Sequence, residues 1–504
     1  MAALILGWLP WLLLAFLTLY LLDLIIHIHR RLPPGPRPLP IIGSLHLLGD
    51  QPHRSLAGLA EKYGPLTSLR LGAVTTVVVS SADVAREFVQ KHDAVFADRS
   101  IPDSIGEHTK NSVIWLYPGP RWRALRRIMA TELFSPHQLD ALQNVRQEKV
   151  EELVGHVARL AREGTPVEVG RVAFTTSLNL LSRTIFSRDL TSLDDRGASK
   201  EFKPVITDIM EAAGSPNFSD FYPAFAAIDL QGWRRQCAWL FRQLHRLFDA
   251  EMDQRKLRGA RENGKEKDDF LEVLLRLAAR DDDMAGLDGD TRRSLFIVRI
   301  TFPVLLLISG SDTSSSTMEW AMAELLNNPV QLAKACDELA HVVGSKRRIE
   351  ESKIVQLPYL QAVVKEKLRL HPPVPLLPHR AKMEMQIMGY TIPKGAKILI
   401  NVWAMGRDKL IWTEPEKFMP ERFIKRTIDF RGGDLELIPF GAGRRICPGM
   451  PLAIRMVHVV LASLLMHFKW RLPDDVERNG IDMTEKFGLT LVKAIPLSTL
   501  ATPT

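Results

Sequence analysis

The chain has 504 residues, of which 46% are hydrophobic and 25% are charged, values close to ordinary globular usage. This composition excludes a disordered, collagen-like or polytopic membrane protein, and the length would allow about three average domains. The three cysteines, Cys237, Cys336 and Cys447, are too few and too far apart for a disulfide scaffold or a zinc domain built from cysteine pairs. The net charge of +8 comes without a long Lys/Arg run, so nucleic-acid binding has little support.

The N-terminus predicts a membrane anchor. Residues 2–22 carry no charge and are rich in Leu, Trp and Phe, and these 21 residues are enough for one helix across a bilayer. A cleaved signal peptide is the alternative, but it would have a basic start and a small-residue cleavage site. Here Arg30 and Arg31 follow the apolar run, which keeps the bulk of the chain in the cytosol. Residues 1–29 are thus predicted to be an anchor.

A proline-rich hinge is predicted at residues 30–46. Five prolines within residues 33–40 force an extended, stiff segment. A ligand for a proline-binding module is the alternative, but the position directly after an anchor favours a spacer.

The remaining chain predicts a mainly α fold with small β-sheets. A hairpin is expected at 67–71 and 75–80, and short strands are expected at 390–393 and 397–401 around a Pro-Lys-Gly turn. Charged stretches at 258–269 and 280–293 predict solvated loops. An acidic run at 281–283 resembles a calcium loop, but Arg292 stands where the final Glu is needed, so this site is rejected. Amphipathic patterns predict helices at 82–91, 122–132, 138–162, 175–186, 233–256, 269–279, 292–327, 329–344, 357–370 and 450–468.

The chemical centre of the sequence is Cys447. A glycine-rich loop at 439–449 delivers it to the start of a helix, with Pro448 suited to the first turn. Backbone N–H groups there would stabilise a thiolate, which is a good axial ligand for haem iron. Gly443 and Gly449 would let the backbone approach a flat group closely, and Arg445 could pair with a carboxylate on that group.

A buried structural cysteine is the alternative for Cys447. The spacing Phe-x-x-Gly-x-Arg-x-Cys-x-Gly, which begins at Phe440, argues against it. Average residue usage would produce this pattern by chance in about one such chain in ten thousand.

With this motif the chain resembles the cytochromes P-450, the haem-thiolate monooxygenases. The resemblance spans nearly the whole chain and implies their fold, an N-terminal transmembrane helix, haem b, and one catalytic domain over 47–504. Cys447 matches the iron ligand. Trp122, Arg126 and His379 match contacts to the haem propionates. Glu366, Arg369 and Arg422, the last within Phe-Met-Pro-Glu-Arg-Phe at 418–423, match a buried charged network that locks the haem-binding core.

A polar run at 309–314 interrupts a long apolar helix pattern. In the family, small residues there open a kink over the haem, and an acid–alcohol pair holds water and relays protons to bound dioxygen. Asp312 and Thr313 match that pair. Ser309 departs from the usual Ala or Gly, and its hydroxyl could alter the water content or contact a polar substrate.

Several stretches, including residues 319–325 and 484–490, resemble the plant geraniol-hydroxylase-like group. Members of that group oxidise monoterpenols, and grass members are associated with labdane-related diterpenes of defence metabolism. The preferred hypothesis is a diterpene hydroxylase, with a monoterpenol hydroxylase as the alternative. A reductase-independent isomerase or dehydratase and a non-catalytic haem carrier are also considered, but both fit poorly with the intact acid–alcohol pair. Family placement gives an apolar substrate pocket of Ile114, Trp115, Phe302, Leu306, Ser309, Val374, Leu376, Leu377, Phe487 and Leu489.

The resemblance also implies partners and a location. The chain has no flavin domain, so electrons should come from an acidic NADPH–haemoprotein reductase. A docking surface for it is predicted from Arg121, Arg123, Arg126, Arg127 and Arg444, with a solvated basic face as the alternative. The expected location is the endoplasmic reticulum membrane, where lipid contacts the anchor and the catalytic domain faces the cytosol.

Overall fold

The computed structural model describes residues 31–194, 198–259, 269–273, 289–344 and 348–504, together with Trp11 and Thr18. The predicted anchor lies outside the described residues except at those two positions, and so does most of the predicted helix at 269–279. Among the described residues, one helix, Met450–His467, is long and apolar enough to cross a membrane, but 61% of it is buried inside the protein.

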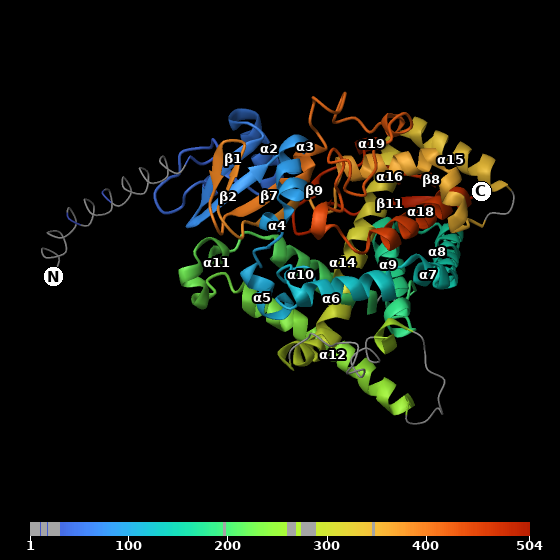
Figure 1. Cartoon of the computed structure of the whole chain (residues 1–504). Coiled ribbons are helices and arrows are strands. Elements are labelled where there is room, and N and C mark those ends of the chain that lie inside the picture. Colours follow the sequence, from blue (N-terminus) through green and yellow to red (C-terminus); the bar gives the residue numbers. More distant parts are fainter. Residues whose placement is uncertain are drawn as a thin grey trace, which may run out of the picture.

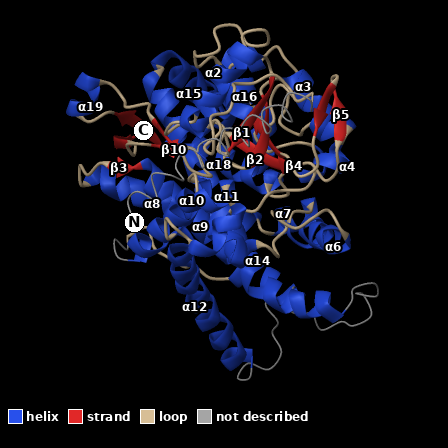
Figure 2. Cartoon of the chain, turned by 90° about the vertical axis from the view of Figure 1, so that its left-hand side faces the viewer, coloured by secondary structure: helices blue, strands red, loops and turns tan. Residues whose placement is uncertain are grey.

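The architecture is mainly helical with small sheets, as the sequence predicts (Figures 1 and 2). The α-helices are α2 (Pro52–Tyr63), α3 (Ala82–Arg86), α4 (Asp93–Phe96), α5 (Asp103–Thr109), α6 (Pro120–Ile128), α7 (Pro136–Ala141), α8 (Gln143–Arg162), α9 (Val169–Phe186), α10 (Ala198–Gly214), α11 (Phe218–Phe221), α12 (Trp233–Gly259), α14 (Gly289–Asn327), α15 (Pro329–Val343), α16 (Pro358–Leu370), α17 (Val402–Met405), α18 (Met450–His467) and α19 (Asp474–Asn479). Tighter or wider helical turns are η1 (Leu45–Leu47), η2 (Glu87–Lys91), η3 (Met129–Leu133), η4 (Pro223–Ile228), η6 (Glu351–Gln356), η7 (Pro420–Phe423) and η8 (Gly443–Arg445).

The strands are short and form several separate sheets. They are β1 (Leu66–Leu71), β2 (Val74–Val79), β3 (Val167–Glu168), β4 (Leu376–Arg380), β5 (Met385–Ile387), β6 (Tyr390–Ile392), β7 (Lys397–Asn401), β8 (Phe468–Arg471), β9 (Glu485–Lys486), β10 (Val492–Lys493) and β11 (Ser498–Pro503). The largest sheet has the order β1-β2-β7-β4, and the smaller ones are β10-β9, β3-β11-β8 and β5-β6.

The largest sheet pairs strands from an early part of the sequence with strands from a late part. The predicted β1–β2 hairpin is present, and β7 lies parallel to β2 with Val79 opposite Ile400. Figure 1 shows these blue and orange strands side by side. The prediction for 390–401 was right about both strands, but they belong to different sheets: β6 pairs with β5, whereas β7 pairs with β2 and β4.

Three predicted helix boundaries were wrong. The helix expected at 138–162 is divided into α7 and α8, and the helices that begin at Ala82 and near Trp122 each change into a wider π-type turn, η2 and η3. The predicted loop at 280–293 overlaps the start of α14 at Gly289. In each case the amphipathic pattern locates the apolar face but does not specify how the backbone adjusts along it.

The long helix α14 is the centre of the packing. It runs beside α9 and also contacts α12, α16 and α18. The approach to α9 is close because Gly310 has no side chain: a Cβ there would lie 2.7 Å from Leu181 Cδ1. Buried polar side chains of α9 form hydrogen bonds with their own helix. The Thr176 hydroxyl donates to the carbonyl of Val172 at 2.8 Å, and the Ser177 hydroxyl donates to that of Ala173 at 2.7 Å.

The proline-rich segment lies on the first strand. Ser68 N donates to the carbonyl of Pro34 at 2.8 Å, and its hydroxyl donates to the carbonyl of Pro33 at 2.5 Å. Gly35 passes so close that a Cβ would lie 1.8 Å from Ser68 O. Gly43 has a φ of +62° and bridges to Leu71. The extended segment is therefore docked on the sheet along β1.

Substituting Gly35→Ala should detach this segment, because the added methyl cannot fit beside Ser68 O. The expected loss is about 1–3 kcal/mol of unfolding free energy, together with faster proteolysis near residue 35. Gly58→Ala is the matched control, since its Cβ would meet nothing within 4 Å in α2. Equal thermal midpoints and proteolysis rates for the two variants would show that the docking contributes nothing.

Candidate functional site

The Cys447 loop is held in shape by its own backbone and by η2. Cys447 N donates to the carbonyl of Phe440 at 2.9 Å, which closes the loop. Gly443 has a φ of +60°, and a Cβ there would lie 2.2 Å from Val89 O. The missing side chain of Gly443 therefore admits the carbonyl of Val89, and the contact of this glycine with a flat group stays a prediction. Gly449 is less constrained, because a Cβ there would meet Phe134 and Cys447 Sγ at ordinary contact distances of 3.7 and 3.8 Å.

The thiol of Cys447 lies at the start of α18. Burial raises its pKa, while the backbone N–H groups of Gly449 and Met450 and the guanidinium group of Arg126 lower it. These donors favour the thiolate over the neutral thiol. The prediction that Pro448 occupies the first turn of the helix was wrong. Helix α18 begins at Met450, and the proline of its first turn is Pro451.

Three arginines surround this region without a carboxylate partner. Among the described residues no Asp or Glu oxygen lies within ion-pair distance of Arg99, Arg126 or Arg445. Arg126 donates to the carbonyl of Ile446 at 2.8 Å. Arg445 donates to the carbonyls of Ala97 at 2.6 Å and Leu116 at 2.5 Å rather than to a carboxylate. Backbone carbonyls, rather than a paired carboxylate, therefore accept the hydrogen bonds of these guanidinium groups.

Trp122 and His379 complete the cluster. The Trp122 ring lies beneath two guanidinium groups, 5.6 Å from Arg126 and 5.2 Å from Arg445, and its N–H donates to the carbonyl of Val113 at 3.0 Å. His379 Nδ1 lies 2.9 Å from the carbonyl of Phe96. Burial and then the nearby charge of Arg99 lower the pKa of His379 to about 3, so the ring is neutral.

Arg99 was missed by the sequence prediction. Burial, and next the charge of Arg445, lower its pKa to about 9, and its Nε is buried without a partner. It donates once, to the carbonyl of Ile114 at 3.1 Å. Nothing in the sequence marks this arginine, because it lies in an irregular segment between α4 and α5. A set of buried cations with an orphaned donor fits a group that carries carboxylates, as haem does through its propionates.

The polar run of α14 lies within an unbroken helix. The hydroxyls of Ser309, Ser311 and Thr313 each donate to the carbonyl four residues before them at 2.6 Å. Asp312 is buried, which raises its pKa, and the Thr490 hydroxyl and Lys203 ammonium oppose that rise. Thr313 borders a small space of about 30 Å³ that Phe440 and residues of α16 and α18 also line. Thr313 therefore faces the Cys447 loop across this space, whereas Asp312 is not among its lining residues.

The predicted charged network is present. Arg369 forms two hydrogen bonds with Glu366, both at 2.7 Å, and both side chains are fully buried. Arg422 Nε donates to the same carboxylate at 3.0 Å. Arg369 also donates to the carbonyls of Gly406 and Pro415 at 2.5 and 2.7 Å. The network therefore ties α16 to the chain that leads into the Cys447 loop.

Only some of the predicted pocket residues line the same cavity. Trp115, Leu376, Phe487 and Leu489 line a cavity of about 150 Å³. Residues from α2, α10 and α11 complete its wall, and the sequence prediction missed them because only the tertiary fold brings them there. The other predicted members do not line that cavity: Ile114, Leu306, Val374 and Leu377 pack in or against apolar cores, Ser309 lies on α14, and the Phe302 side chain is outside the described residues.

The predicted docking arginines divide into two groups. Arg123 and Arg127 are exposed on α6, and Arg444 is exposed but paired with Asp93 at 2.9 Å. Arg126 points inward and belongs to the buried cluster, and Arg121 is half-buried and donates to Asn111 at 3.4 Å. The accessible basic surface is thus smaller than the sequence predicts.

A family model for cytochrome P-450 matches residues 33–497. The chain belongs to the cytochrome P-450 family. Geraniol 8-hydroxylase from Swertia mussotii is 47% identical over 481 residues, covering 94% of each chain. Geraniol 8-hydroxylase from Catharanthus roseus is 48% identical and covers 93% of each chain. Geranylhydroquinone 3''-hydroxylase from Arnebia euchroma is 43% identical over 94% of each chain. Family membership identifies this cytochrome P-450 as a monooxygenase that uses haem with a cysteine thiolate as axial ligand.

Substituting Glu366→Gln should destabilise this cytochrome P-450 by about 3–5 kcal/mol, because it leaves two guanidinium groups with an uncharged partner in a buried site. Urea unfolding measures the loss. Glu414→Gln breaks only the exposed pair with Lys417 and should cost less than about 1 kcal/mol. A similar small cost for both variants would contradict a stabilising role for the network.

Proposed function

We propose that this cytochrome P-450 hydroxylates a terpenoid alcohol of monoterpenol type. The observation that carries the proposal is the high-coverage similarity to two geraniol 8-hydroxylases together with an apolar cavity lined by Trp115, Phe487 and Leu489. These relatives favour the monoterpenol alternative over the labdane-related diterpene expected from the sequence. A diterpene hydroxylase remains the second substrate class, and the same experiment tests it.

Cys447 is the proposed axial ligand, and the arginine cluster is the proposed seat of the propionates. When bound, thiolate-ligated haem supplies the reductive activation of dioxygen that inserts one oxygen atom into a C–H bond. Arg99, Arg126 and Arg445 would neutralise the carboxylates, and Trp122 and His379 would pack beside them. The N–H groups of Gly449 and Met450 keep the thiolate charge stabilised.

Asp312 and Thr313 are the proposed proton-handling residues. Burial raises the pKa of Asp312, so its carboxyl group holds a proton at higher pH than an exposed aspartate. The Thr313 hydroxyl donates to the carbonyl of Ser309 at 2.6 Å and keeps its oxygen free to accept a hydrogen bond from water. Ser309 adds a hydroxyl four residues before Thr313 on the same helix, where it would influence how much water stays near the reacting carbon.

A membrane-bound NADPH–haemoprotein reductase is the proposed electron donor, and the endoplasmic reticulum is the proposed location. The exposed Arg123 and Arg127 of α6 support this partner, because they lie on the same short helix as Arg126, which contacts the Cys447 loop. An acidic surface would be attracted to that side of the molecule.

The proposal is tested by expressing the full chain with a plant reductase and feeding geraniol and a labdane diterpene in parallel. The expected result is NADPH-dependent hydroxylation of geraniol, identified by mass spectrometry. Ferrous protein with carbon monoxide should show the red-shifted thiolate band, and Cys447→Ala should lose it. Hydroxylation of the diterpene alone would overturn the monoterpenol class, and turnover without NADPH would indicate an isomerase or dehydratase.

Charge reversal at Arg123 and Arg127 together should raise the reductase concentration for half-maximal rate by about tenfold at low salt, because two attractive charges become repulsive. Charge reversal at Arg162 is the control, since this basic residue is exposed at the end of α8. Reductase titrations that give the same half-maximal concentration for all three proteins would exclude this docking surface.

A further inference from the structure

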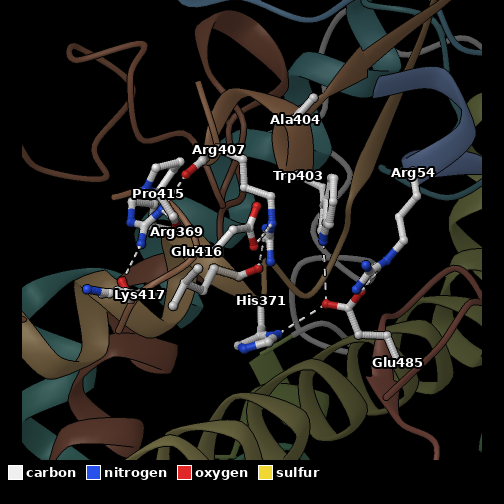
Figure 3. Close-up of polar contacts among 12 residues, drawn as sticks. Arg54, Arg369, His371, Trp403, Ala404, Arg407, Pro415, Glu416, Lys417 and Glu485 are labelled. Carbon is white, nitrogen blue, oxygen red and sulfur yellow. Dashed lines mark hydrogen bonds and ion pairs between the residues drawn. The ribbon is translucent and has the colours of Figure 1, made fainter. Parts of the chain in front are cut away.

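A second buried charged cluster surrounds Glu485, outside the haem-binding motifs. Its side chain is fully buried, and it contacts His53 at 3.4 Å, Arg54 at 2.7 Å and His371 at 3.1 Å. The Trp403 N–H points at the same carboxylate at 3.4 Å. Figure 3 shows Arg54, His371 and Trp403 converging on Glu485. We call these five residues the Glu485 clamp.

The clamp joins four parts of the fold. Glu485 is in β9, His53 and Arg54 are in α2, Trp403 is in α17, and His371 follows the last residue of α16. Burial alone would raise the pKa of Glu485, but hydrogen bonds from His371, His53 and Arg54 keep it far below its usual range. The carboxylate is therefore ionised and bound on several sides.

His371 connects the clamp to the central helix. Its Nε2 lies 2.7 Å from Glu324 of α14, while its Nδ1 faces Glu485. Each ring nitrogen therefore faces one carboxylate, and the ring bridges β9 and α14. Trp320 stacks on this ring with centroids 3.9 Å apart, which fixes its plane.

The clamp is adjacent to the substrate cavity. Phe487, two residues after Glu485, stacks on His53 with centroids 5.5 Å apart. Phe487 and Leu489 line the cavity of about 150 Å³, and Pro52 and Leu56 of α2 line it as well. The clamp thus holds both the hairpin that supplies two cavity residues and the helix that they face.

We propose that Glu485 is a positioning residue that fixes the hairpin 485–493 against α2 and thereby sets which carbon of the substrate is oxidised. This proposal rests on the proposed function for its consequence, but the positioning itself is independent of the substrate. Glu485 does not line the cavity: it acts through Phe487 and Leu489, whose placement depends on the clamp.

The test compares Glu485→Gln with Glu416→Gln in the full-length haem-loaded protein. Glutamine keeps the size of the side chain but removes the charge that binds three cationic or polar partners. Glu416 is the matched control because its carboxylate is 71% exposed and pairs with Arg407, which stacks on the same Trp403 ring at 3.8 Å. The carbon monoxide band of both variants should equal that of the parent protein.

Two readouts are expected to change only in Glu485→Gln. Amide hydrogen exchange across residues 485–493 should quicken by about tenfold. With the accepted terpenoid, the ratio of hydroxylated products should change and KM should rise by about fivefold, while kcat stays within about twofold. Unchanged exchange would overturn the positioning role, and faster exchange with an unchanged product ratio would overturn its link to selectivity.

Arg54→Met provides a second variant if Glu485→Gln does not fold. The Arg54 side chain is 47% exposed, so its loss leaves the core intact while removing one clamp partner. Arg54→Met should change the hydrogen exchange, the product ratio and KM in the same directions as Glu485→Gln, but by smaller amounts. A parent protein that oxidises no terpenoid would contradict the proposed function alone, because the exchange experiment needs no substrate.

Discussion

The need to neutralise buried charge organises this molecule. Arg369 and Glu366 pair with each other, and Glu485 is bound by residues from three other parts of the fold. Arg99, Arg126 and Arg445 have no paired carboxylate among the described residues, and burial lowers the pKa of each. A chain that folds around three such cations gains stability from an anionic ligand that binds the folded state alone. Haem binding and folding are therefore expected to be coupled through the propionates as well as through the thiolate.

The two satisfied clusters have different tasks in this scheme. Glu366 binds Arg369 on its own helix and Arg422 in η7, and so fixes the approach to the Cys447 loop. Glu485 binds α2 and the residue that ends α16, on the side of the substrate cavity. Arg369 and His371 are two residues apart in the sequence. This short stretch therefore connects the network beside the Cys447 loop to the Glu485 clamp beside the substrate cavity. Figure 3 shows Arg369 and Trp403 in one view, with Arg407 between them.

Local patterns predicted what depends on local spacing. The long helices, the β1–β2 hairpin and the Glu366–Arg369 pair each follow from residues close in sequence. Arg99 and the Glu485 clamp could not be predicted in this way. Arg99 has no motif around it, and the clamp partners Arg54 and Glu485 are 431 residues apart in the sequence. The predicted pocket members that pack in or against apolar cores stay a prediction, since a core and a cavity wall have the same composition. Gly443 shows a related limit of local patterns: a glycine indicates a close approach without indicating that Val89 O is the group that approaches.

The parallel pairing of β2 with β7 has a consequence for how the chain is made. Strand β2 can pair with β7 only after Ile400, the partner of Val79, has been synthesised. Strands β1 and β2 are therefore made long before the sheet is complete. Closing such a long loop is slow, and an unpaired strand edge invites contact with other chains. At a synthesis rate of about 5–20 residues per second, that edge stays open for tens of seconds. The proline-rich segment docks on β1, at the opposite edge of the hairpin, so it does not shield the edge of β2 during this interval.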